Sequence, residues 1–72
     1  SVRLAIANEN VPNMVGQISS ALASASLNIA DLLNKSRGDL AYSLIDVDGA
    51  AIPESVVQQL RAIPGVLSVR VL

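Results

Sequence analysis

The segment from residue 8 to residue 13 holds the side chains best suited to binding a ligand. Asn8, Asn10 and Asn13 surround Pro12, just where a helix is expected to begin. The N-terminus of a helix carries unpaired N–H donors and about half a positive charge, which favours a carboxylate. An asparagine side chain offers a donor and an acceptor without charge, and this suits a zwitterion such as a free amino acid. Asparagine is also a common turn and capping residue, so a purely structural role for these three remains open.

A fourth asparagine, Asn28, lies between Leu27 and Ile29 at the start of a predicted strand, where a turn explains it less well. If this strand is at the edge of a sheet, Asn28 faces whatever pairs there. A second copy that docks edge to edge would then bring its Asn28 toward the 8–13 loop of the first copy. This arrangement predicts a binding site shared by two chains, in which the ligand stabilises the assembly.

The composition argues against most other chemistry. The 72 residues include no Cys and no His, so disulfides, thiolate or imidazole metal ligands, Cys nucleophiles and general bases that titrate near neutrality are excluded. We therefore expect no catalytic residues, no metal and no cofactor in this domain. Six acidic and five basic residues give a net charge of −1, and Tyr42 is the only aromatic residue, which argues against nucleic-acid binding. No apolar run approaches the length of about 20 residues that spans a bilayer, and we expect a cytoplasmic domain without membrane contact.

Hydrophobic periodicity predicts the elements that position these residues. Period-2 alternation indicates strands over 2–7 and 66–72, and the most continuous apolar run indicates a central strand over 40–48. The segment 27–36 is predicted to form a further strand with polar residues on both faces near its end, and apolar residues at three- and four-residue spacing indicate helices over 12–25 and 53–63. Pro12 and Pro53 are each expected to open a helix. The segment 37–39 is expected to form a hairpin turn. Met14 and Tyr42 are assigned to packing.

The order strand, helix, strand, strand, helix, strand is that of the split βαβ, ferredoxin-like α+β fold. Right-handed crossovers place both helices on one face of a four-stranded antiparallel sheet, with the first and third strands in the centre. We expect one domain over residues 1–72. The face without helices is expected to carry small residues: Ala5, Ala7, Ala41 and Ser43. A second copy, a partner or a ligand would cover the remaining edge or face.

Several segments resemble the C-terminal ACT domain of D-3-phosphoglycerate dehydrogenase, an enzyme of serine biosynthesis. They are NVP at 10–12, LNIA at 27–30, YSLIDVD at 42–48 and AIPGV at 62–66, and the resemblance extends over the whole chain. It implies a regulatory βαββαβ module that pairs with a second copy and binds L-serine at the interface.

By the same resemblance, Asn10 matches the effector-binding asparagine of the first loop and Asn28 matches the one contributed by the partner domain. Asn8 stands where that family has histidine, and Asn13 stands where glycine is common. The backbone around Val11, Pro12 and Asn13 is expected to contribute amides, with only a carbonyl from Pro12.

The sequence thus predicts an amino-acid-binding, allosteric homo-oligomerisation domain that is not itself an enzyme. Since Ser1 leads directly into a strand without an initiator Met, we expect a piece of a larger protein, an NAD-dependent oxidoreductase whose NAD site is outside this domain. Two alternatives remain: a structural dimerisation module that binds no effector, and a sensor of another amino acid.

Overall fold

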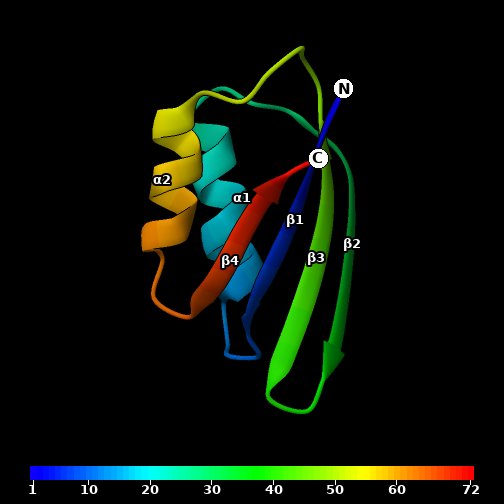
Figure 1. Ribbon diagram of the computed structural model, residues 1–72, viewed down its shortest axis with the longest axis vertical. Coiled ribbons are helices and arrows are strands. Elements are labelled where there is room, and N and C mark those ends of the chain that lie inside the picture. Colours follow the sequence, from blue (N-terminus) through cyan, green and yellow to red (C-terminus); the bar gives the residue numbers. More distant parts are fainter.

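The computed structural model describes residues 1–72 and shows a four-stranded sheet with both helices on one face (Figure 1). The elements in chain order are β1 (Val2–Glu9), α1 (Met14–Ser24), β2 (Ile29–Arg37), β3 (Leu40–Val47), α2 (Glu54–Ala62) and β4 (Val66–Val71). The strand order is β2-β3-β1-β4 and every pairing is antiparallel. The predicted ferredoxin-like fold, with β1 and β3 in the centre, is confirmed. No helix in the chain has the length and apolar character needed to span a membrane.

The core lies between the helices and the inner face of the sheet. Residues of β1 alternate, so that Leu4, Ile6 and Asn8 point toward the helices and are buried. Met14, Ile18 and Leu22 of α1 recur every four residues and pack against the buried side chains of the sheet. Val56, Val57 and Leu60 of α2 pack against the same side chains. Because burial of apolar surface is the main stabilising term, this layer arrangement follows from the two periodicities in the sequence.

The prediction for the two faces of β3 was wrong in part. Ala41 and Ser43 are buried beneath the helices, because they lie in phase with Ile45 and Val47 of the same strand. Tyr42, which we had assigned to packing, is on the opposite face with 57% of its surface exposed. The face without helices therefore carries large apolar side chains as well as Ala5 and Ala7.

Several element boundaries also differ from the predictions. Helix α1 begins at Met14 and not at Pro12, because Asn13 adopts a left-handed conformation (φ 64°) that redirects the chain before the first helical turn. Strand β1 continues through Asn8 and Glu9, which we had placed in a loop, because Asn8 pairs with Ala41 of β3. Pro53 is the N-cap of α2 and does not belong to its first turn.

The two ends of the sheet differ in what they hold. At one end, the turn between β2 and β3 and the loop after β1 are joined by a bond from the Asn10 N–H to the Asp39 carbonyl (2.8 Å). We call this the loop end. At the other end the Leu72 N–H donates to the Arg3 carbonyl (2.9 Å), which places both chain termini together (Figure 1). We call this the terminus end.

Candidate functional site

A hollow of about 170 Å³ opens at the loop end, beside the N-terminus of α1. It is formed by the end of β1, the following loop, the first turn of α1 and the neighbouring strands. Its lining residues are Asn8, Asn10, Val11, Asn13, Met14, Val15, Gly16, Asn34 and Ala41. The structure thus brings together Asn8, Asn10, Val11 and Asn13 of the predicted site, whereas Pro12 and Asn28 do not line this hollow.

Asn8 is the most buried polar residue of the hollow, with 1% of its surface exposed. Its Nδ2 donates to the Glu9 carbonyl at 2.8 Å. Its Oδ1 is buried and accepts no hydrogen bond from any group in the chain. A buried acceptor without a partner costs about 1–3 kcal/mol, so a stable core would not retain it without compensation. The Oδ1 of Asn8 is therefore an acceptor that a donor on a ligand, or a water molecule, could satisfy.

Asn10 holds the rim of the hollow in place. Its Nδ2 donates to the Gly38 carbonyl at 3.0 Å, and Gly38 belongs to the turn between β2 and β3. The side chain is exposed, and its Oδ1 is left available to a donor. Asn10 therefore joins two loops and still offers an acceptor at the mouth of the hollow.

Asn13 and Gly16 shape the helix end of the hollow. The first amides of a helix have no intrahelical acceptor, and in α1 no side chain caps them. A Cβ on Gly16 would collide with Oδ1 of Asn13, which shows that the Asn13 side chain lies over the first turn. Asparagine is one of the few residues other than glycine that adopt a left-handed backbone readily. At this position it adds an amide to the hollow while keeping the turn.

Asn34 completes the set and was missed in the sequence. It lies on β2, and its Nδ2 donates to Oγ of Ser43 at 2.8 Å. The alternation Leu32, Asn34, Ser36 on the helix side of an edge strand was a usable signal, because an apolar face that turns polar near a strand end often borders an opening. Four amide side chains and no ionisable side chain line the hollow.

Asn28 lies at the terminus end, immediately before β2. Its Nδ2 donates to Oδ2 of Asp48 at 2.7 Å, and its carbonyl accepts from the Asp48 N–H at 2.9 Å. Asn34, the residue of β2 that lines the hollow, is six residues further along the chain, which corresponds to about 20 Å at about 3.3 Å per residue. Within one chain the structure therefore keeps Asn28 apart from the other predicted contacts.

The close ion pair of the chain also lies at the terminus end. Nε and Nη2 of Arg3 donate to the two carboxylate oxygens of Asp46 at 2.8 and 3.1 Å. This hydrogen bonding holds the pKa of Asp46 below its usual value and raises the pKa of Arg3. The pair supports the sheet and has no part in the hollow.

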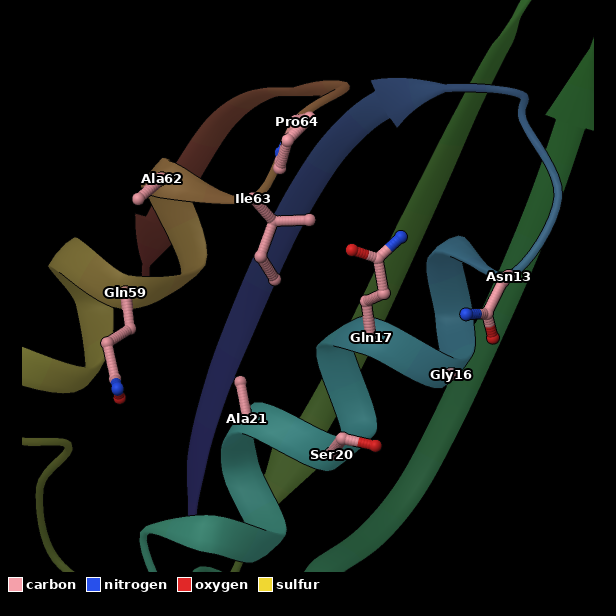
Figure 2. Close-up of a pocket in the computed structure, with 9 residues that line it drawn as sticks. All are labelled: Asn13, Gly16, Gln17, Ser20, Ala21, Gln59, Ala62, Ile63 and Pro64. Carbon is pink, nitrogen blue, oxygen red and sulfur yellow. The ribbon is translucent and has the colours of Figure 1, made fainter.

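A wider groove of about 580 Å³ lies between α1 and α2 (Figure 2). Figure 2 shows the Gln17 amide directed toward the segment that carries Ile63 and Pro64, while Gln59 points away from it. No ionisable residue lines the groove. Because its polar groups do not converge, it is a less suitable site for a small polar ligand than the hollow at the loop end.

Comparison with known proteins identifies the fold. No family model and no curated protein sequence matches the chain. Among solved structures, the ACT domain from GTP pyrophosphokinase of Chlorobium tepidum superposes with a TM-score of 0.83 at 18% identity, covering 99% of this chain and 95% of that one. This chain has the ACT-domain fold.

Two further structures support this conclusion. An unknown protein from Galdieria sulphuraria has a TM-score of 0.78 at 23% identity, and the match covers 99% of this chain and 44% of that one. The C-terminal domain of the MgtC protein from Mycobacterium tuberculosis has a TM-score of 0.73 at 15% identity and covers 99% and 83% of the two chains. At these identities the likeness establishes the fold, and the resemblance to the phosphoglycerate dehydrogenase domain stays a prediction.

Proposed function

We propose that this ACT-type domain is a regulatory module that pairs with a second copy and binds a small amino acid, L-serine first, in the hollow at the loop end. The observation that carries the proposal is the buried Oδ1 of Asn8, which has no donor within the chain. The parent protein would be an NAD-dependent D-3-phosphoglycerate dehydrogenase, and its NAD would bind outside this domain.

The chemistry of the hollow suits a zwitterion. The ammonium group of an amino acid supplies the donors that Oδ1 of Asn8 and Oδ1 of Asn10 lack. Its carboxylate is favoured at the uncapped N-terminus of α1. A volume of about 170 Å³ is room for a few water-sized groups at about 30 Å³ each. This favours a small side chain such as that of serine over a large apolar one.

Pairing through β2 would bring Asn28 to this site. Strand β2 is an unpaired edge of the sheet, and exposed edges are templates for pairing. An antiparallel pair centred on Leu33 places Asp31 of each copy opposite Lys35 of the other, and opposite charges across strands are favourable. The same register carries Asn28 of the second copy to within about one residue of Gly38, next to Asn10. A ligand held between the two copies then binds the pair more tightly than the single chain.

The test is a titration of the domain with a panel of L-amino acids, followed by calorimetry and by sedimentation. Serine is expected to bind and to strengthen dimerisation, and at 100 times its Kd it should stabilise the folded state by about 2.7 kcal/mol. A dimer that is indifferent to every amino acid would leave only a structural pairing module. Binding of a different amino acid would replace serine as the effector.

The substitution Asn28→Ala separates the shared site from a site within one chain. It should weaken serine binding at least about tenfold, the cost of a lost hydrogen bond to a charged ligand group, without unfolding the domain. Asp48→Ala is the matched control, since it removes the partner of Asn28 within the chain but keeps the Asn28 amide. Unchanged affinity in Asn28→Ala would mean that Asn28 is not part of the site.

A further inference from the structure

The sheet face without helices has the character of an interface. Along its centre lie Leu33 of β2, Leu40, Tyr42 and Leu44 of β3, and all four are exposed. At the centre of this face the neighbouring β1 contributes the small side chains of Ala5 and Ala7. Soluble monomers seldom expose a contiguous apolar patch of this kind, and such patches with a charged border mark contact surfaces.

The charged border is arranged with opposite signs at the two ends of the sheet. On β2, Asp31 is near the terminus end and Arg37 is at the loop end. On β1, Arg3 is at the terminus end and Glu9 is at the loop end. Asp31, Arg37 and Glu9 form no ion pair within the chain, while Arg3 is bonded to Asp46. Three charges of this border are thus free to meet charges of another molecule.

A rotation by half a turn about an axis across the strands brings opposite charges at the ends of this face together, and it sets Leu33 against Lys35 of the other copy. The rotation lays each strand over the same strand of a second copy but in the reverse direction. Asp31 then faces Arg37 of the other copy, and Arg3 faces Glu9. At the centre Leu44 faces Tyr42, and Ala5 faces Ala7. Rotation about an axis along the strands instead lays β2 over β4 and leaves Asp31 and Arg37 without opposite charges.

A shallow depression on the same face offers a seat for the aromatic ring. It has a volume of about 190 Å³, and its lining includes Ala5, Ala7, Leu44 and Arg70 together with Tyr42 itself. The small alanines form a floor between the larger side chains. Arg70 has no acidic partner in the chain, and a guanidinium beside an aromatic ring is a favourable cation–π contact. Tyr42, with 57% of its surface exposed, is the largest side chain available to fill such a depression.

From this complementarity we propose that a second copy of the chain stacks on the open face of the sheet, with Tyr42 of each copy seated in the depression of the other. Aligned sheets pack about 10 Å apart with interdigitating side chains. This interface is separate from the edge of β2 and does not depend on ligand binding. Its twofold axis runs parallel to the two sheets and midway between them, whereas that of the edge pair is perpendicular to the sheet.

Tyr42 provides a selective probe, since it is the only aromatic residue. Edge pairing through β2 leaves its ring exposed, whereas face stacking buries it. We expect acrylamide quenching of tyrosine fluorescence to fall at least about twofold as the protein concentration rises through the dissociation constant, because the ring leaves water. A quenching constant that stays unchanged while sedimentation shows assembly would overturn the proposal. So would a protein that remains monomeric in sedimentation up to millimolar concentration.

One substitution on the open face of the sheet and one on the exposed side of α1 test whether stacking occurs through the sheet. Leu44→Lys should remove the concentration dependence of the quenching and keep the fold, because Leu44 is partly exposed and a lysine stem lies along apolar surface. Ala23→Lys, an exposed position on α1, should leave the dependence unchanged. Loss of the dependence in Ala23→Lys, or its persistence in Leu44→Lys, would contradict stacking through this face.

A charge exchange tests the axis. Asp31→Arg alone should raise the concentration at which quenching falls by about tenfold, since it sets two like charges against each other. Adding Arg37→Asp should restore the original midpoint, because the two charges have only changed places. A double variant that is no better than the single one would rule out the axis across the strands.

Discussion

Replacing Asn8 with leucine should make the domain more stable and, under the proposed function, unable to bind the amino acid. The two side chains are similar in shape, and only 1% of the surface of Asn8 is exposed. Leucine removes the orphaned Oδ1, whose burial costs about 1–3 kcal/mol, and loses one hydrogen bond worth about 1 kcal/mol. The Glu9 carbonyl that accepted this bond still accepts from the Val11 N–H at 2.9 Å, so no new orphan is created.

The remaining balance includes the burial of the added methyl groups beside Met14, and the sum favours leucine by about 1–2 kcal/mol. For a domain of this size each kcal/mol corresponds to about 4–8 °C in Tm, so a rise of about 4–16 °C is expected. The assay is thermal unfolding followed by circular dichroism, with and without the amino acid. The ligand should raise the Tm of the natural chain and leave that of Asn8→Leu unchanged.

A matched amide on the surface controls for the change in side-chain type. The side chain of Gln59 in α2 is exposed and makes no hydrogen bond, and Gln59→Leu should change the stability by less than about 0.5 kcal/mol. The reasoning is refuted if Asn8→Leu is less stable than the natural chain, because the Asn8 oxygen would then be satisfied and not a cost retained for a ligand.

Two further predictions concern the helix start and the ion pair. Gly16→Ala should change stability little, because the gain of about 1 kcal/mol in helix propensity is offset by displacement of the Asn13 amide. In an Asn13→Gly background, Gly16→Ala should stabilise the domain by about 0.5–1 kcal/mol, which urea unfolding would measure. If the Asn13→Gly, Gly16→Ala double variant were less stable than Asn13→Gly alone, the added methyl group would be colliding with the backbone of α1 and not with the Asn13 side chain. The Arg3–Asp46 pair lowers the pKa of Asp46 in the folded state below its ordinary value of 3.8, so the contribution of the pair to stability is complete above about pH 4. This contribution is lost as the pH falls through the lowered pKa. Asp46→Asn should therefore unfold less steeply with acid below pH 4, in a pH titration of the Tm, and an unchanged acid slope would mean that the pair adds no stability.

The element types and their order were predictable because each segment has a clear period. The apolar spacing of α1 and α2 and the alternation of β1 and β4 are produced by burial on one side, which is the physical cause of both the pattern and the fold. The gathering of Asn8, Asn10 and Asn13 near a helix start was also predictable, because all three are close in the sequence.

The faces of β3 and the full set of lining residues were not predictable in the same way. Within 40–44 the larger apolar residues are outside and the smaller Ala41 and Ser43 are inside, so hydrophobicity gives the wrong phase. Asn34 reaches the hollow only because β2 pairs with β3, a contact between strands whose register depends on the two-residue turn between them. Composition alone suggested a loop at Asn8, where pairing between distant segments extends the strand.

The position of the termini has a consequence for how a signal would leave this domain. Both ends of the chain are at the end of the sheet that holds Asn28, and the hollow is at the opposite end. When two copies pair antiparallel through β2, the hollow of one lies against the terminus end of the other. An effector bound mainly by the loop of one subunit would then act on the segments attached to its neighbour. Mixed dimers of a binding-deficient and an intact chain would reveal this crossed regulation. The loss of the response to the effector would appear in the intact subunit, because the hollow that acts on it belongs to the binding-deficient partner.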